Sequence, residues 1–143
     1  MTKITRSALV MHSAEEMFEL VNDVRRYPEF LSGCENTEVL AEGEDYIEAR
    51  LTIAKAGFEQ SFSTRNSLQR PQRMDMRLVD GPFSHFHGTW HFTSLSQQAC
   101  KVSRELAFEM ANRLPGAAIG AVFKQVANTI ADAFVARAGV GYG

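Results

Sequence analysis

The chain has few cysteines, little net charge and no long apolar run, and each shortage excludes a class of protein. Cys34 and Cys100 form neither a C-x-x-C pair nor a disulfide framework, so we expect two free thiols in a reducing compartment. A net charge of −2 lacks the basic excess of a general nucleic-acid binder, and we expect no specific DNA binding. No apolar stretch approaches the ~18 residues of a membrane span, and no apolar leader opens the chain. These absences predict a cytoplasmic protein, with membrane contact only as a peripheral association at the inner membrane.

Catalytic motifs are missing as well. The sequence contains no G-x-S-x-G elbow, phosphate loop, dinucleotide fingerprint or H-E-x-x-H helix. Polyketide cyclisation would need an acid and a base in one cavity, and Arg104 with Tyr27 makes a poor pair. We therefore predict no enzyme activity, no catalytic residue and no cofactor, and keep a cyclase as the enzymatic alternative.

The first third of the chain predicts one strand and two short helices. Residues 3–11 alternate as a strand does. Ser13 and Glu16 then have the spacing of a capping box, which starts a helix running to about Asp23. Tyr27-Pro28 opens a second helical turn, since proline suits the first position of a helix.

The rest of the chain predicts about six strands and one long helix. From Glu35 to Met110, alternating segments are separated by short turns, which is typical of an antiparallel sheet. Pro115 starts a helix that continues to about Ala138, with apolar residues at spacings of three and four. The sequence thus predicts one α+β domain over residues 1–143, in which a curved antiparallel sheet wraps around the long C-terminal helix. We expect residues 139–143 to be a frayed tail.

Two motifs resemble those of a known superfamily. They are "LVNDVRRYPEFLSGC" at residues 20–34 and "LVDGPFSHFHGTWHF" at residues 78–92. Together they are similar to signatures of the START-like (SRPBCC) helix-grip superfamily, also called START/Bet v-like. Within it they match the coenzyme Q-binding and polyketide cyclase-like branch. Ser32 replaces the usual proline of the first motif, and Phe86 the usual leucine of the second.

The resemblance covers the whole chain and implies two roles. One is to bind ubiquinone or another isoprenoid and to chaperone it in support of respiration. The other is that of a ribosome association toxin, which binds the large ribosomal subunit and blocks subunit joining. The resemblance also implies a tunnel between the sheet and the long helix.

The histidine-rich second motif can be interpreted as a metal site or as a strand. Side chains alternate along a strand, so His85, His87 and His91 share one face. A catalytic zinc usually takes three protein ligands, and His91 lies too far along the strand to join the other two. We therefore predict no metal site and an outward histidine face.

The opposite, aromatic face is the predicted ligand site. Gly88 on that face would leave room among large residues near the centre of the sheet. Apolar walls with a few polar groups are what a hydrophobic ligand needs. The predicted ligand-binding residues are Tyr27, Phe30, Phe62, Met76, Leu78, Phe83, Phe86, Trp90, Phe92, Arg104, Leu106, Phe108, Val122, Phe123, Val126 and Ile130.

Four positions leave alternatives open. Alternation puts Arg104 on the apolar face, where it meets a quinone oxygen, reaches solvent, forms an ion pair, or is turned outward by a β-bulge. Tyr27 is either a core tyrosine or a contact to the ligand's head group. Gly81-Pro82-Phe83 is either an ordinary turn or a gate with an exposed aromatic ring. Asn22 and Asp23 are expected to cap the first helix.

The functional prediction is the binding and chaperoning of a hydrophobic isoprenoid, above all ubiquinone. The alternative is the ribosome-directed role, for which the residue-level hint is an arginine concentration at Arg65, Arg70, Arg73 and Arg77. Contacts between these arginines and phosphates would weaken steeply as salt rises. The predicted partners are accordingly a ubiquinone-like small molecule, a membrane surface or the large ribosomal subunit.

Overall fold

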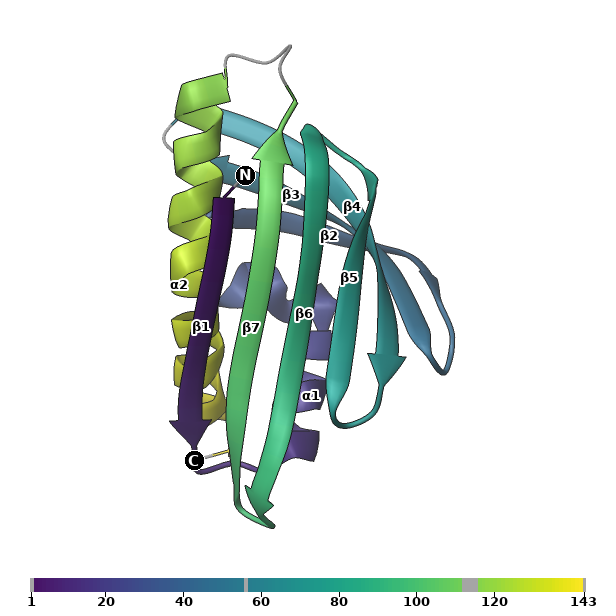
Figure 1. The fold of residues 1–143 in the computed structure, drawn as a ribbon, viewed down its shortest axis with the longest axis vertical. Coiled ribbons are helices and arrows are strands. Elements are labelled where there is room, and N and C mark those ends of the chain that lie inside the picture. Colours follow the sequence, from purple (N-terminus) through teal and green to yellow (C-terminus); the bar gives the residue numbers. More distant parts are fainter. Residues whose placement is uncertain (1, 56, 112–115, 143) are drawn as a thin grey trace.

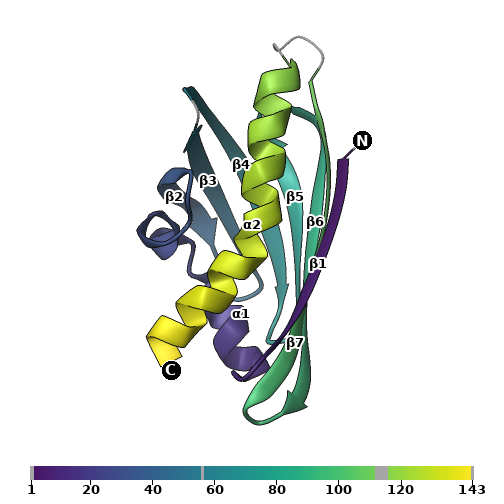
Figure 2. The ribbon, with the colours of Figure 1, turned by 90° about the vertical axis from the view of Figure 1, so that its left-hand side faces the viewer.

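The computed structural model describes residues 2–55, 57–111 and 116–142 and has the predicted α+β helix-grip architecture (Figure 1). Seven antiparallel strands form one sheet in the order β1-β7-β6-β5-β4-β3-β2, and the helices lie on its inner side (Figures 1 and 2). The elements are β1 (Thr2–Val10), α1 (Ala14–Asn22), the 3₁₀ helix η1 (Val24–Glu29), β2 (Cys34–Glu42), β3 (Tyr46–Lys55), β4 (Phe58–Gln69), β5 (Arg73–Asp80), β6 (Phe83–Ser96), β7 (Ala99–Met110) and α2 (Gly116–Tyr142).

The two short helices close one end of the sheet. The predicted capping box is present: the Glu16 amide donates to the Ser13 hydroxyl at 3.1 Å, and the Ser13 amide donates to the Glu16 carboxylate at 3.2 Å. This satisfies amides that the first turn of a helix leaves without partners. The start predicted for η1 is wrong, because the helix begins at Val24 and Pro28 lies inside it.

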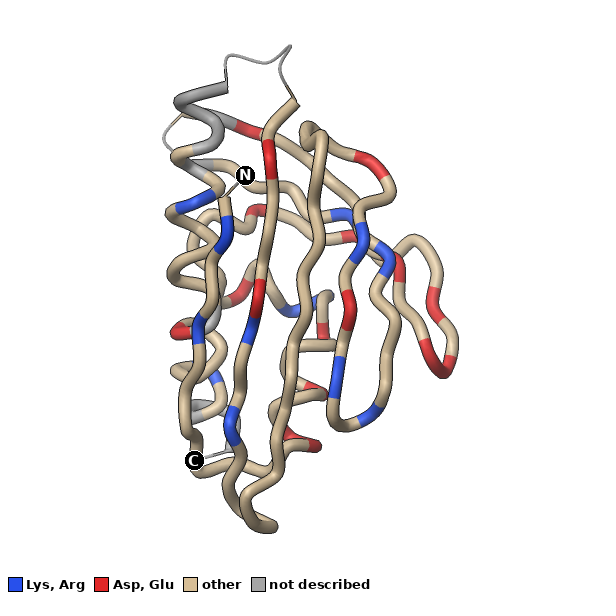
Figure 3. Tube along the Cα trace, in the orientation of Figure 1, with Lys and Arg blue, Asp and Glu red and all other residues tan. Residues whose placement is uncertain are grey.

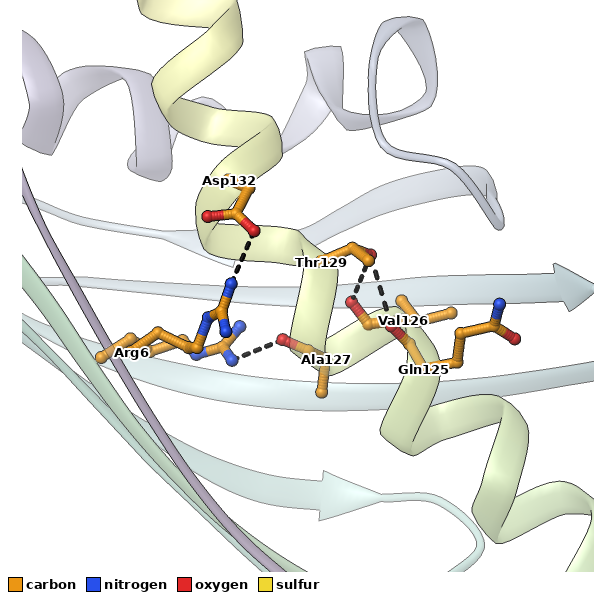
Figure 4. Close-up of polar contacts among 7 residues, drawn as sticks. Arg6, Gln125, Val126, Ala127, Thr129 and Asp132 are labelled. Atoms are coloured by element: carbon orange, nitrogen blue, oxygen red, sulfur yellow. Dashed lines mark hydrogen bonds and ion pairs between the residues drawn. The ribbon is translucent and has the colours of Figure 1, made fainter.

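The long helix α2 lies along the inner face of the sheet (Figure 2). Its predicted start at Pro115 falls outside the described residues. Its predicted end is wrong, because the helix continues from Ala138 to Tyr142. Figure 2 shows α2 bending near its middle, where the Thr129 hydroxyl donates to the carbonyls of Gln125 and Val126 (Figure 4). Such bonds from a hydroxyl to the preceding turn often bend helices.

Side chains alternate along β6 as predicted. Trp90 and Phe92 are buried on the inner face, and Phe86 is half-buried there. On the outer face His85 and His87 are exposed, whereas His91 is half-buried. Within the described part of the chain, no three His, Cys, Asp or Glu side chains come close enough to hold a metal ion. None of the helices described is long and apolar enough to cross a membrane.

Candidate ligand cavity

A cavity of about 100 Å³ lies between the inner face of the sheet and α2. Strands β3 to β7 supply one wall, while η1 and α2 supply the other. Most of the predicted ligand-binding residues line it. They are Tyr27, Phe62, Met76, Phe83, Phe86, Trp90, Arg104, Leu106, Phe108, Phe123, Val126 and Ile130.

Three predicted residues, Phe30, Leu78 and Phe92, are not among those that line this cavity. Phe92 is buried behind it, with its ring 5.6 Å from that of Phe18. Phe30 is half-buried against Phe134, and Leu78 is a half-buried residue beside the core. The side chain of Val122 lies outside the described residues.

Phenylalanine rings crowd one side of the cavity. The Phe83 ring lies 5.0 Å from Phe123, 5.1 Å from Phe86 and 5.5 Å from Phe62, mostly in tilted or edge-on contacts. Such contacts between aromatic rings are favourable beyond the area they bury. Phe83 is only 7% exposed, so the expected exposed aromatic at Gly81-Pro82-Phe83 is wrong. The motif instead directs a ring into the cavity wall.

At Gly81 and Gly88 the missing side chain lets a neighbouring residue pack closely against the backbone, and it leaves no open space. A Cβ at Gly81 would lie 2.6 Å from the Phe62 Cβ, closer than real Cβ contacts come. A Cβ at Gly88 would meet the methyl group of Met76. The room that we expected Gly88 to leave is therefore occupied by the Met76 side chain.

Arg104 points inward and is 2% exposed, which excludes the bulge that would have turned it outward. It pairs in register with Trp90 on β6 and with Arg6 on β1. Its Nη2 donates to the carbonyl of Ala127 on α2, while its buried Nε has no partner among the described residues. Burial, together with the nearby Arg6, lowers the pKa of Arg104 to about 10, so it remains a cation at neutral pH.

Three neutral polar residues share the cavity with Arg104. The Tyr27 hydroxyl donates to the carbonyl of Val21, and burial raises the pKa of this phenol. Tyr27 is thus a core tyrosine with a satisfied hydroxyl that also lines the cavity. Thr64 is 4% exposed and donates to the Asn66 Oδ1 at 3.0 Å. Polar groups therefore stand on β4 and β7, on different parts of the cavity wall.

Asp23 caps the C-terminal end of α1 as predicted, although through its backbone rather than its side chain, whereas Asn22 is the last residue of the helix. The Asn22 Oδ1 is buried without a partner among the described residues. Asp23 makes no side-chain capping bond, and its carboxylate lies 3.2 Å from Arg26. The backbone amide of Asp23 ends the helix by donating to the carbonyl of Leu20.

Sequence reasoning missed several lining residues: Val24, Ala49, Leu51, Ile53, Thr64, Asn66, Ala127 and Phe134. The signal for some of them was present, because Ala49, Leu51 and Ile53 alternate on one face of β3. Thr64 and Asn66 share the parity of Phe62 on β4, but small polar residues carry no hydrophobic signal.

The arginine concentration lies largely on the outer face, where the arginines have acidic neighbours. Lys and Arg are interspersed with Asp and Glu over β4, β5 and β7, while β6 carries neither (Figure 3). Arg65 lies 3.6 Å from Glu48, and Arg73 lies 2.9 Å from Asp75. Arg70 pairs with Glu19 on α1. Arg77 has no ion-pair partner in the described part of the chain, and it stands in register between Arg65 and His87.

The sequence and the fold are both similar to those of known proteins. The family model described as polyketide cyclase / dehydrase and lipid transport matches residues 10–135. The chain is 46% identical over 142 residues to the ribosome association toxin RatA of Pseudomonas aeruginosa, covering 99% of both proteins. It is 21% identical over 135 residues to the mitochondrial coenzyme Q-binding protein COQ10 of Drosophila melanogaster, covering 92% of this chain and 56% of that protein. The solved ZhuI aromatase/cyclase of Streptomyces sp. R1128 has a TM-score of 0.83 at 20% identity, with 96% and 93% of the two chains covered, which shows the shared fold.

Proposed function

The chain belongs to the polyketide cyclase/dehydrase and lipid transport family, and we propose that within this family it acts on the ribosome. The proposed action is to bind the large ribosomal subunit and to hinder the joining of the two subunits. The observation that carries the proposal is the 46% identity, over almost the full length of both chains, to a ribosome association toxin.

The outer face of the sheet supplies a surface for this role. Arg65, Arg73 and Arg77 are exposed there; Arg65 pairs with the half-buried carboxylate of Glu48, and Arg73 donates two hydrogen bonds to that of Asp75. Arg77 has no ion-pair partner among the described residues, so an RNA phosphate can contact it without displacing a carboxylate. A contact of this kind releases counterions and weakens as salt rises.

A subunit-joining assay tests the proposal. Purified chain is titrated into separated small and large subunits under conditions where they join, and the products are resolved on a density gradient. We expect free subunits to accumulate, and the chain to sediment with the large subunit alone. An unchanged fraction of joined ribosomes at a tenfold molar excess of chain would contradict the proposal. Heat-denatured chain is the control for non-specific aggregation.

We propose as a second function that the cavity binds a hydrophobic small molecule. The supporting observation is an apolar wall with a buried cation, whose Nε has no partner among the described residues. Ubiquinone, the ligand expected from the sequence, would place its ring here and its isoprenoid tail outside the cavity. Organic extraction of the chain purified from a quinone-containing host tests this. A quinone-free extract, together with no uptake of quinone on reconstitution, would exclude ubiquinone.

A further inference from the structure

The cavity contains a buried cation, Arg104, that forms no direct ion pair with a described residue. Arg6 and Arg104 are register partners on β1 and β7, and both reach α2. Arg6 meets the carboxylate of Asp132 at 2.6 Å (Figure 4), whereas Arg104 meets only a backbone carbonyl. No carboxylate is among the described residues that line the cavity, and the nearby Asp132, whose charge favours the cation, is paired directly with Arg6. The positive charge of Arg104 is therefore not neutralised by any described side chain that lines the cavity.

The guanidinium also keeps hydrogen-bonding capacity for a ligand. It has five N–H donors, and the structure assigns one partner, the carbonyl of Ala127. The Nε–H is buried and unpaired among the described residues. A buried donor without a partner is costly, and an ionised acceptor compensates it better than a neutral one does.

The volume of the cavity matches a group of about one ring. Its volume of about 100 Å³ is close to the ~150 Å³ of an engineered apolar cavity that takes benzene. Sites for drug-sized ligands run from roughly 300 Å³ upward. Aromatic rings from β4, β6, β7 and α2 make up much of the wall, a surface suited to the flat faces of a ring.

We propose that the cavity binds a compact single-ring carboxylate, with the ring among the phenylalanines and the carboxylate on Arg104. This inference rests on the second proposed function, that the cavity takes a ligand. It goes beyond that function in naming an anionic ligand rather than a neutral quinone. Thr64 and Asn66 offer a further polar contact to a substituent on the ring.

The chain supplies its own reporter for a binding experiment. Trp90 is the only tryptophan, lines the cavity, and lies with its ring centroid 5.8 Å from the Arg104 guanidinium carbon. Tryptophan fluorescence is titrated with benzoate and with benzyl alcohol, a neutral molecule of similar size. We expect the wild-type chain to bind benzoate at least tenfold more tightly, the lower end of what a hydrogen bond to a charged group contributes.

Two matched variants isolate the charge. Arg104→Met removes the buried cation, and Arg6→Met removes its register partner, which does not line the cavity. We expect R104M to lose the preference for benzoate while still binding benzyl alcohol, and R6M to keep the preference. Binding of benzyl alcohol to R104M also shows that the variant cavity is folded.

The other possible results of these titrations each contradict a different part of the proposal. Equal affinity of the wild-type chain for benzoate and benzyl alcohol would overturn the carboxylate proposal and leave a neutral ligand site. Unchanged benzoate affinity in R104M would overturn the role of Arg104. Binding of neither compound to the wild-type chain would overturn the underlying proposal that the cavity takes a ligand.

Discussion

Replacing Arg104 by methionine should not destabilise the chain, although Arg104 is among the most deeply buried of its large side chains. Burial lowers the pKa of Arg104 to about 10. Since each tenfold change in proton affinity corresponds to about 1.4 kcal/mol, holding this cation in the folded chain costs roughly 3 kcal/mol. Methionine is unbranched like the aliphatic part of arginine, flexible enough to fill part of the space, and uncharged, so Arg104→Met removes that cost.

The substitution also removes a favourable contact. The bond from Arg104 to the Ala127 carbonyl contributes about 1.5–3 kcal/mol, as hydrogen bonds to charged groups do. The two terms nearly cancel, and replacing buried charges by apolar residues is often neutral or stabilising by ~1–4 kcal/mol. We expect R104M to unfold with a free energy equal to that of the wild-type chain or up to about 2 kcal/mol higher.

Guanidinium chloride unfolding followed by circular dichroism measures this difference. Arg104→Ala is the contrast, because it leaves a void and should lose about 2 kcal/mol or more of the free energy of unfolding.

The difference in stability between the wild-type chain and R104M should also depend on pH, with a defined sign. The folded chain releases the Arg104 proton at lower pH than the unfolded chain, so the wild-type chain should gain stability relative to R104M above pH 10. If R104M lost more than about 2 kcal/mol of the free energy of unfolding at pH 7, the statement that the buried charge of Arg104 lowers the stability of the chain would be refuted.

Three further predictions concern the core, a turn and a thiol. Phe134→Ala should lower the free energy of unfolding by about 3–5 kcal/mol. The reason is that the centroid of its ring lies 5.3–5.4 Å from those of Tyr27, Phe30 and Trp90. As a control, substitution of an exposed residue, Val79→Ala, should change the free energy of unfolding by less than about 0.5 kcal/mol. Gly81→Ala should cost more than about 1 kcal/mol because its Cβ would overlap Phe62 on β4, which thermal unfolding would detect and an unchanged melting temperature would contradict. Burial raises the pKa of Cys34 to about 11, so in a Cys100→Ala background its alkylation rate should climb about tenfold per pH unit through pH 10; a plateau near pH 9 would contradict this.

The sequence predicts the fold well because its signals are local and periodic. The capping box at Ser13 and the alternation along β6 specify their elements without help from distant residues. The C-terminal end of α2 and the start of η1 were less well predicted, because proline positions and short apolar tails fit several boundaries. Alternation alone correctly placed Arg104 on the inner face, where a search for charged surface residues would have missed it.

The cavity was harder to predict than the fold. The alternation along each strand tells which side chains face inward. The volume left between them depends on the conformations of long side chains such as that of Met76. The wide isoprenoid tunnel implied by the family resemblance is, in this chain, a small space narrowed by Met76 and a group of phenylalanine rings. Gly88 therefore predicts a close contact just as well as it predicts a void.

The two proposed functions use opposite faces of the same sheet. Arg104 lies on the inner face, while Arg77 is exposed on the outer face beside Arg65. Because Arg104 is 2% exposed, it cannot contact a ribosome directly in this conformation. If ribosome association depends only on the outer face, R104M should retain it fully while losing benzoate binding. Loss of both in R104M would contradict this separation, and would show that ribosome association also depends on the inner side, where Arg104 donates to the Ala127 carbonyl of α2.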